Sequence, residues 1–333
     1  MQKVRINLKI IILIFLIALF AGIGQTQQKD ENSAGFPVLK GKYLGQKPPG
    51  DTPELFAPGI ISTCNQHSSA VFTHDGKEVY FSQMFPHPAK IMFMKEINGR
   101  WTEPEVAPFS GKYNDLTPFI SSDGNKIYFT SNRPIKKGAK PGWPSSDFWV
   151  VTRTEDGWLE PEFISIRIPG TIQQDGASVT DNGTFYFSGK PDKRTGRKSD
   201  IYRSLFQDGI YSEPERFSDE VNSEYVDGFS FIAPDESYII FCSFRPGGYG
   251  MSDLYISFFR SDGTWTTPKN MGRKINSEAK DAFPYVTPDG KYFFFNSSRV
   301  SVLNDRKIPD GPGNIYWVDA RIIEELKKEV LKY

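Results

Sequence analysis

Short runs of alternating apolar and polar residues, separated by tight turns, recur along this chain. The run Asp281–Arg299 alternates up to the turn Pro288-Asp289-Gly290 and continues as the β-rich stretch Tyr292–Phe295. This pattern is typical of two short antiparallel strands joined by a hairpin turn. Similar sequences occur at Val71–Gln83, Phe119–Arg133, Val179–Gly189 and Phe231–Arg245. The turn residues Asp75, Asp123, Asn182, Asp235 and Asp289 are 48, 59, 53 and 54 residues apart. A period of about 50 residues with several strands per unit predicts a β-propeller.

Each unit is predicted to contribute four antiparallel strands. The last strand is a Pro-led segment, at Pro104–Ser110, Pro161–Arg167, Pro214–Ser218 and Pro268–Gly272. The fifth unit has no such segment after Tyr316, whereas Pro53–Ser62, ahead of the first unit, has the same character. We therefore expect Pro53–Ser62 to supply the missing outer strand and to close the ring, which removes an exposed sheet edge. The predicted fold is all-β: a five-bladed β-propeller of four-stranded antiparallel blades, closed by an N-terminal strand, with a short C-terminal helix.

The two ends of the chain have different patterns. Basic residues precede the apolar run Ile10–Gly24, which ends in small residues, and this is typical of a secretory signal peptide over residues 1–24. An uncleaved membrane anchor is the alternative. Residues 25–50 are expected to form a flexible linker, and residues 51–333 a single propeller domain. Apolar residues at helical spacing predict a helix over residues 319–332 with Asp319 as its N-cap. This helix is expected to pack over one mouth or the side of the ring, and docking of a partner is the alternative.

Composition narrows the possible functions. Aromatic residues make up 14% of the 333 residues, which suits sheets packed through large rings. The net charge is zero, so the chain has no strong field to attract nucleic acid. Cys64 and Cys242 fall in units that are not neighbours, which favours two thiols over a disulfide. Neither the cysteines nor the three histidines have metal-ligand spacing, and no phosphate loop or nucleophile elbow is present, so we expect no metal and no cofactor.

The repeated sequence resembles the WD40-like β-propeller repeat of the TolB type. The copies at Val286–Arg299 and Ile232–Arg245 are the most similar, and Asp253-Leu254-Tyr255 completes the second of them. The match extends over residues 53–318, and it is specific for the fold because it recurs five times. The resemblance implies an extracytoplasmic bacterial propeller, usually a binding or scaffolding platform in the cell envelope.

A set of polar residues stands just before the first strand of each unit. Because the first strand of a propeller blade is innermost, these side chains are expected to converge near one mouth of the channel. They could bind a cation or a hydroxyl-rich substrate such as a sugar. Alternatively, each carboxylate could accept backbone N–H groups and fix the register between blades, which the recurrence of the position favours. The residues are His67, Asp115, Asp175, Asp227 and Asp281.

Arginines and long loops complete the candidate chemistry. Arg133, Arg245 and Arg299 end their repeats, and we expect them to pair with Asp147, Asp253 or a carboxylate of a neighbouring unit rather than with an anionic ligand. The loops between second and third strands should project from one face. The residues expected there to contact a partner are Trp143, Tyr249, Lys136, Lys137 and Lys140.

Two functions follow from this pattern. The first is a non-catalytic, exported, monomeric binding or scaffolding propeller that engages an envelope protein or a glycan on its loop face or channel mouth. The second is a carbohydrate-active hydrolase or lyase that uses channel carboxylates, since glycoside hydrolysis requires a pair of them. No inner glutamate with an evident acid role is found in the sequence, so no catalytic residue is assigned.

Overall fold

The computed structural model describes residues 35–332, apart from residues 64, 66, 137, 139–145, 170, 192–197, 304–305 and 309–312. The chain divides into a unit that ends at Val38 and a unit that begins at Leu39. Gly35–Val38, the described part of the first unit, contains no helix or strand. The predicted signal peptide, residues 1–24, lies outside the described residues.

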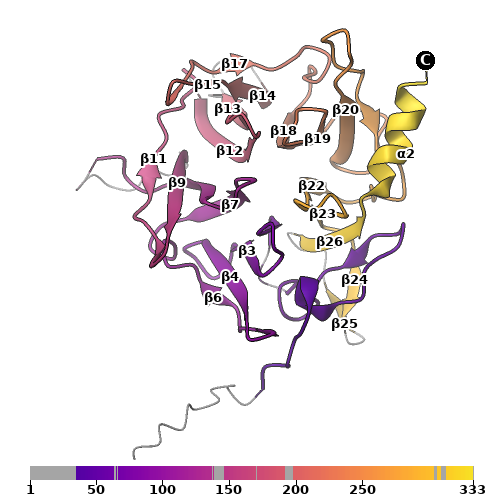
Figure 1. Cartoon of the computed structure of the whole chain (residues 1–333). Helices are drawn as coiled ribbons and strands as arrows, with labels where there is room; N and C mark the ends of the chain where they lie inside the picture. Colours follow the sequence, from indigo (N-terminus) through magenta and orange to yellow (C-terminus); the bar gives the residue numbers. More distant parts are fainter. Residues whose placement is uncertain are drawn as a thin grey trace, which may run out of the picture. The chain divides into compact units, whose positions relative to one another are not determined.

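The second unit is a five-bladed β-propeller, as the repeat predicts (Figure 1). Blade one comprises β2 (Ala70–Phe72), β3 (Glu78–Gln83), β4 (Lys90–Ile97) and β6 (Glu105–Val106). Blade two comprises β7 (Asp115–Ile120), β8 (Lys126–Ser131), β9 (Asp147–Thr154) and β11 (Glu162–Phe163). Blade three comprises β12 (Thr171–Val179), β13 (Phe185–Pro191), β14 (Asp200–Ser204) and β17 (Glu215–Arg216). Blade four comprises β18 (Asp227–Ile232), β19 (Tyr238–Ser243), β20 (Asp253–Phe258) and β21 (Lys269–Asn270).

Blade five is closed by the strand from the other end of the chain. It comprises β22 (Asp281–Val286), β23 (Tyr292–Ser297), β26 (Asn314–Asp319) and the early strand β1 (Glu54–Leu55). Glu54 lies opposite Trp317 and Leu55 opposite Tyr316 in an antiparallel pair. The next residue, Phe56, is fully buried and makes edge-to-face contacts with Trp317 and other rings. The predicted closure of the ring is confirmed, and it leaves blade five with four strands like the others.

Residues 39–45, which fall in the segment predicted as a linker, pack between blades one and five. This segment contains the 3₁₀ turn η1 (Lys42–Gly45), and Tyr43 and Leu44 are buried. The Tyr43 ring lies 5.0 Å from the ring of Phe72 in blade one and 4.8 Å from that of Tyr292 in blade five. The Trp101 indole N–H donates to the carbonyl of Gly41 at 2.8 Å. We name residues 39–45 the N-terminal wedge.

Aromatic residues from short outer hairpins fill the spaces between other blades. Trp158, in β10 (Gly157–Trp158), donates its indole N–H to the hydroxyl of Tyr80 in blade one at 3.2 Å. Trp265 packs with its ring 5.3 Å from that of Phe217, between blades three and four. Trp101, in β5 (Arg100–Trp101), contacts the N-terminal wedge in the same way. Trp158 and Trp265 therefore attach their hairpins to the preceding blade, and Trp101 attaches its hairpin to the N-terminal wedge.

The C-terminal helix α2 (Arg321–Val330) lies along the outer side of the ring, beside β20 and β26 (Figure 1). It is shorter than the predicted range 319–332, and Ala320 rather than Asp319 is its N-cap. The Asp319 carboxylate still accepts the backbone N–H of Arg321 at 2.9 Å. Ile323 and Leu326 are buried, and Glu329 pairs with Lys269 of β21 at 3.2 Å. Within the described part of the chain, no helix is long and apolar enough to cross a membrane.

Candidate functional site

The inner strands share a local conformation that defines equivalent positions in the blades. In blades two to five, one residue of the inner strand is left-handed, with φ of 50°, 69°, 47° and 53° at Thr117, Gly176, Phe229 and Phe283. Two residues earlier stand Asp115, Gln174, Asp227 and Asp281. Asp175 therefore lies one residue beyond the position that the sequence pattern assigns to it, and Gln174 occupies that position in blade three.

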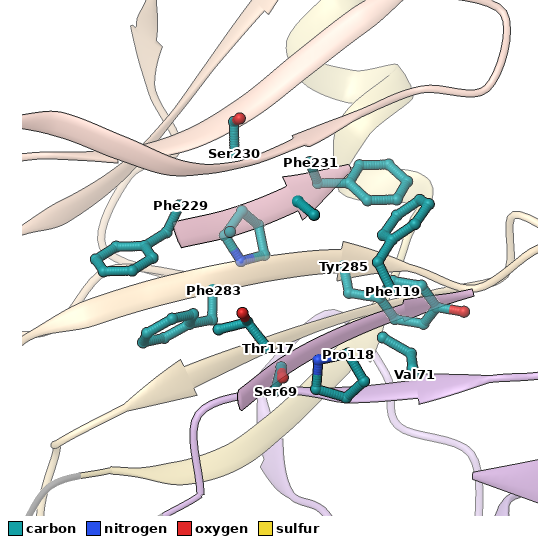
Figure 2. A pocket seen from close by; sticks show the side chains of 13 residues that line it. Ser69, Val71, Thr117, Pro118, Phe119, Phe229, Ser230, Phe231, Phe283 and Tyr285 are labelled. Carbon is teal, nitrogen blue, oxygen red and sulfur yellow. The ribbon is translucent and has the colours of Figure 1, made fainter. Parts of the chain in front are cut away.

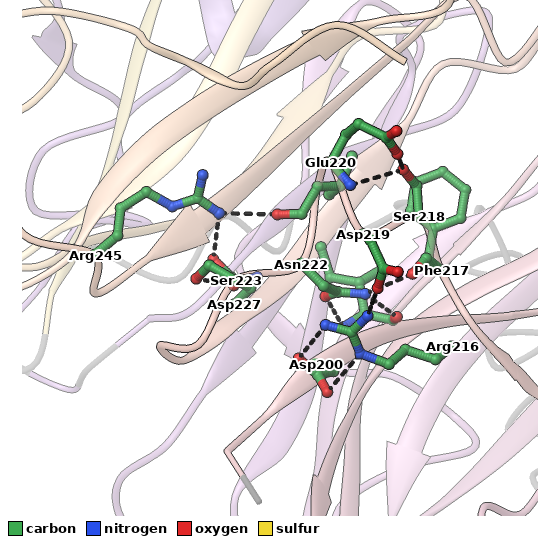
Figure 3. Close-up of polar contacts among 12 residues, drawn as sticks. Asp200, Arg216, Phe217, Ser218, Asp219, Glu220, Asn222, Ser223, Asp227 and Arg245 are labelled. Carbon is green, nitrogen blue, oxygen red and sulfur yellow. Dashed lines mark hydrogen bonds and ion pairs between the residues drawn. The ribbon is translucent and has the colours of Figure 1, made fainter. Parts of the chain in front are cut away.

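Three of the predicted carboxylates lie in the same buried arrangement, which Figure 3 shows for Asp227. Arg245 donates from Nη2 to Asp227 Oδ1 at 2.9 Å and to the carbonyl of Val221 at 2.8 Å, and from Nε to Ser243 Oγ at 2.9 Å. The backbone N–H and hydroxyl of Ser223 both donate to Asp227 Oδ2 at 2.6 Å. The arrangement thus joins two strands of blade four to the segment that leads into it.

The same Asp–Ser–Arg clamp recurs in blades two and five. Arg133 pairs with Asp115 at 2.8 Å, and Arg299 pairs with Asp281 at 2.9 Å. The Asp115, Asp227 and Asp281 side chains are fully buried. Burial raises the pKa of Asp115, against the opposing effect of the Arg133 charge. These contacts support the structural interpretation of the repeated carboxylates, because their oxygens are occupied by protein donors.

The arginines Arg133, Arg245 and Arg299 pair with carboxylates, as predicted, but their partners are not Asp147 or Asp253. Each arginine of a clamp binds the carboxylate of its own blade, because its side chain turns back toward the start of the inner strand. Asp147 instead pairs with Arg167 at 2.7 Å. Asp253 accepts the backbone N–H groups of Tyr249 at 2.6 Å and Gly250 at 3.1 Å, and so holds the loop before β20.

Uncharged side chains take the equivalent place in blades one and three. His67 is buried, with Nδ1 3.1 Å from the carbonyl of Ser82 and Nε2 2.8 Å from Thr63 Oγ1. Burial lowers the pKa of His67 to about 4, so the ring is neutral near pH 7. Gln174 donates to the carbonyl of Ile166 at 3.0 Å and accepts from the backbone N–H of Ile168 at 3.0 Å. Both residues fix the segment around them, as the clamps do.

The central channel is narrow and mainly apolar, as Figure 2 shows. Its cavity of about 30 Å³ is lined by residues of all five inner strands and has room for about one water molecule. Phe229 and Phe283 lie at one end, and Phe119, Phe231 and Tyr285 lie at the other. Among the described residues that line it, the polar side chains are hydroxyls and no carboxylate is present. Within this described lining, the cavity is smaller than a sugar ring and offers no pair of carboxyl groups like the one that glycoside hydrolysis uses.

The mouth of this channel carries an aromatic pair beside a lysine and a carboxylate. The Phe229 and Phe283 rings lie 4.2 Å apart, and Lys280 Nζ is 5.6 Å from the centroid of each. Burial raises the pKa of Asp175 to about 7, opposed by a hydrogen bond from Gln173 and by the charges of Lys190 and Lys280. We name Asp175, Phe229, Lys280 and Phe283 the mouth cluster.

A groove of about 800 Å³ adjoins the mouth cluster between blades four and five. Met251 and Val300 are 69% and 52% exposed, and Lys280 belongs to both the groove and the mouth cluster. Tyr249, two residues before Met251, is also exposed, and the Arg273 guanidinium lies 5.0 Å from its ring centroid. We name this feature the blade 4–5 groove; its lining residues are Met251, Glu278, Ala279, Lys280, Ser298, Arg299 and Val300.

The structure places the predicted partner-binding residues in different regions. Tyr249 lies beside the blade 4–5 groove, whereas Lys136 is exposed in the loop that precedes β9. Lys137, Lys140 and Trp143 lie outside the described residues. The sequence pattern did not select Met251, Lys280 or the two phenylalanines. The phenylalanines had a usable signal, because Phe229 and Phe283 follow Asp227 and Asp281 at the same spacing.

Metal and thiol chemistry find little support in the described part of the chain. There, no three His, Cys, Asp or Glu side chains are grouped so as to hold a metal ion. Cys242 is a buried free thiol, and burial raises its pKa to about 12. Cys64 lies outside the described residues.

Comparisons with known proteins find only distant similarities. No family model matches the chain, and no curated protein matches it in sequence. A putative TolB from Agrobacterium tumefaciens is 17% identical, covering 78% of this chain and 92% of that one, with a TM-score of 0.48. TolB from Acinetobacter baumannii is also 17% identical, covering 78% and 59%, with a TM-score of 0.47. An endo-arabinase from Bacteroides thetaiotaomicron is 11% identical, covering 78% and 96%, with a TM-score of 0.49. Similarities this distant do not assign an activity or a partner.

Proposed function

We propose that this chain is an exported, non-catalytic binding propeller that docks a protein partner of the cell envelope on its mouth face. The observation that carries the proposal is the blade 4–5 groove, where Met251 and Val300 expose most of their apolar side chains beside Lys280. Exposed apolar side chains around a concave surface are typical of interaction sites. The proposed export rests on the basic and apolar pattern of the first residues.

The charges around the groove indicate the chemistry of the partner. Lys190 and Lys198 are exposed on the blade-three strands and loop that end at this face, and Lys280 joins the groove to the mouth cluster. Glu278 is an acidic residue on the groove wall. A segment with an aliphatic or aromatic side chain next to Asp or Glu would fill the groove and pair with Lys280. Tyr249, held by Arg273, would cover the rim.

The carboxylates of the inner strands support binding rather than catalysis. Asp115, Asp227 and Asp281 are each bonded to an arginine and are closed off from solvent. Asp175 is partly exposed at the mouth, and Gln174 rather than a second acid stands beside it. Because hydrolases of glycosides use two carboxyl groups about 5–10 Å apart, the one carboxylate that belongs to the mouth cluster does not by itself meet their requirement.

A charge placed in the groove tests the proposal. The wild-type protein and the variants Met251→Asp and Ile97→Asp would each be used to capture proteins from an envelope extract. Ile97 is a suitable control because it is exposed apolar surface in blade one, away from the groove. The captured partner would then be purified and its affinity measured by calorimetry. Met251→Asp should weaken binding by at least about tenfold, because it puts a charge where an apolar side chain of the partner would lie and competes with the partner's acidic group for Lys280.

Two results would contradict this proposal. The first is a partner that binds the Met251→Asp variant as tightly as the wild type. The second is a glycan array on which the wild type binds a sugar through the groove while no protein is captured. The ligand of the groove would then be a glycan and not a protein.

A further inference from the structure

The space between blades two and three is filled differently from the others. Its outer hairpin, β15 (Phe206–Gln207) and β16 (Ile210–Tyr211), presents Tyr211 where the neighbouring hairpins present Trp158 and Trp265. Tyr211 packs on Phe185 at 5.7 Å and hydrogen-bonds to the hydroxyl of Tyr128 in blade two. A tyrosine ring is smaller than an indole, and a hollow of about 350 Å³ remains beside it. That volume is within the range of small-ligand sites.

One wall of this hollow is an exposed aromatic ring. Phe206 is 38% exposed, and its ring centroid lies 4.8 Å from that of Tyr211. Gly183 makes this position possible, because it has a φ of 88° and a Cβ added there would lie 3.0 Å from the Phe206 ring. The ring is therefore held against the backbone of the β12–β13 turn, with part of its surface open to solvent.

The rest of the hollow is polar and carries both signs of charge. Its lining includes Tyr128 and Tyr211, together with Ser122, Lys126 and Asp181. The Asp181 backbone is fixed by a hydrogen bond from its N–H to the carbonyl of Pro234 at 2.9 Å, while its side chain is exposed. A ligand here would meet an apolar ring face, several hydroxyls, an acceptor and a cation.

We propose that this hollow, between blades two and three, binds a neutral oligosaccharide. The apolar face of a pyranose ring would stack on Phe206, and its hydroxyls would donate to Asp181 and exchange hydrogen bonds with Tyr211 and Ser122. The mixture of Asp181 and Lys126 gives no preference for a strongly charged ligand. The hollow lies at the hairpin-turn ends of β7 and β12, whereas the blade 4–5 groove adjoins the opposite ends of the inner strands. The inference is therefore independent of the proposed protein partner.

Binding of defined oligosaccharides to the full chain tests the proposal. Cellohexaose, maltohexaose and chitotetraose would be titrated by calorimetry and by saturation-transfer NMR, with affinity sought down to a Kd of about 1 mM. Phe206→Ala should weaken binding of the recognised sugar by at least about tenfold, and Asp181→Asn by several-fold. Ile210→Ala is the matched control, because Ile210 lies on the same hairpin, is 72% exposed and does not line the hollow.

Each outcome of these titrations either supports or overturns the proposed sugar site. Binding that is lost in Phe206→Ala and Asp181→Asn and kept in Ile210→Ala and Met251→Asp would support the site. Failure of all three sugars to bind the wild type would overturn it, as would equal affinity in Phe206→Ala and the wild type. If a peptide library rather than a sugar occupied the Phe206 surface, the ligand class would be wrong. Thermal unfolding of each variant shows whether a loss of binding reflects a loss of fold. If Phe206→Ala does not fold, Asp181→Asn tests the site, because the Asp181 side chain is exposed.

Discussion

A buried carboxylate is unfavourable unless its oxygens find donors, and Asp115, Asp227 and Asp281 each have an arginine and at least one hydroxyl. The donors come from the strand that follows and from the segment that precedes the blade. In Asp281, for example, Oδ2 accepts the N–H and hydroxyl of Ser277 while Oδ1 accepts from Arg299. The side chain therefore fixes a junction between blades through three separate parts of the chain.

Replacing one clamp carboxylate should reduce stability without removing the binding sites. In Asp281→Asn, Arg299 loses its counter-charge but stays about one-fifth exposed to water. We expect the free energy of unfolding to fall by about 3 kcal/mol, the lower end for breaking a buried ion pair. Asp227→Asn should behave alike because its contacts are the same. The exposed turn variant Asp262→Asn is the control, and urea unfolding is the measurement. A loss of partner binding at unchanged stability would instead indicate a ligand role.

Asp175 should make stability depend on pH in the direction opposite to an ordinary ion-paired carboxylate. Its pKa is raised to about 7 by burial, whereas an unfolded aspartate titrates near pH 4. Between these values the folded chain binds a proton that the unfolded chain does not, so stability falls as pH rises from about 4 to 7. Asp175→Asn should therefore be more stable than the wild type at about pH 8, by about 1–2 kcal/mol since the side chain is partly exposed. The difference should vanish at about pH 4, as urea unfolding at both pH values would show. An equal difference at both would exclude this titration.

The sequence predicted the kind of residue at the inner-strand position but not its register in blade three. The sequence pattern predicts an aspartate there because three of the other four repeats have one, yet the backbone aligns Gln174 with Asp227. The usable signal was Gly176, which accommodates the left-handed conformation that Thr117 and Phe283 adopt under strain in their own blades. Side-chain identity alone could not show it, because an amide satisfies the same backbone groups as a carboxylate.

Among the elements, the N-terminal wedge is the one whose packing its composition does not predict. Its Lys and Gly residues and the prolines that follow are typical of a linker. Yet Tyr43 is 7% exposed and contacts rings of blades one and five. The closing strand was predictable because its repeat partner was missing at the end of the chain. The wedge has no counterpart in any repeat, so only tertiary packing identifies it.

Removing the wedge side chain should loosen the junction at which the ring closes. Tyr43→Ala deletes contacts with Phe72 and Tyr292 and a hydroxyl hydrogen bond to Asp289. We expect the variant to be less stable by about 3 kcal/mol, as for other large buried aromatic residues. Val38→Ala, at a side chain that is 56% exposed, should change stability by less than about 0.5 kcal/mol. Chemical unfolding of both variants distinguishes a packed wedge from a loose linker, for which the two substitutions would be equally neutral.

In the propeller unit as a whole, the blades are held by several repeated contacts whose polar groups are hydrogen-bonded, rather than by one movable interface. Clamps tie blades two, four and five to the segments that lead into them, aromatic hairpins contact the preceding blade, and Arg153 pairs with Glu78 between blades one and two. The channel through the centre has room for about one water molecule. Coupling between distant sites needs an element with two arrangements that both ligands bias, and these contacts offer none. The blade 4–5 groove and the hollow beside Phe206 should therefore act independently.

The double variant Met251→Asp/Phe206→Ala tests that independence. Each substitution should weaken one interaction by at least about tenfold and leave the other affinity unchanged within about twofold, and the double variant should show the sum of the two effects. Saturating the hollow with the recognised oligosaccharide should likewise leave the affinity for the protein partner unchanged, as calorimetry in the presence and absence of sugar would measure. With both sites intact, one propeller should hold protein and sugar at the same time, because the two sites lie at opposite ends of the inner strands. A sugar that changed the partner's affinity by tenfold or more, a coupling of about 1.4 kcal/mol, would require a movable element among the blades and would contradict a ring that the clamps hold rigid.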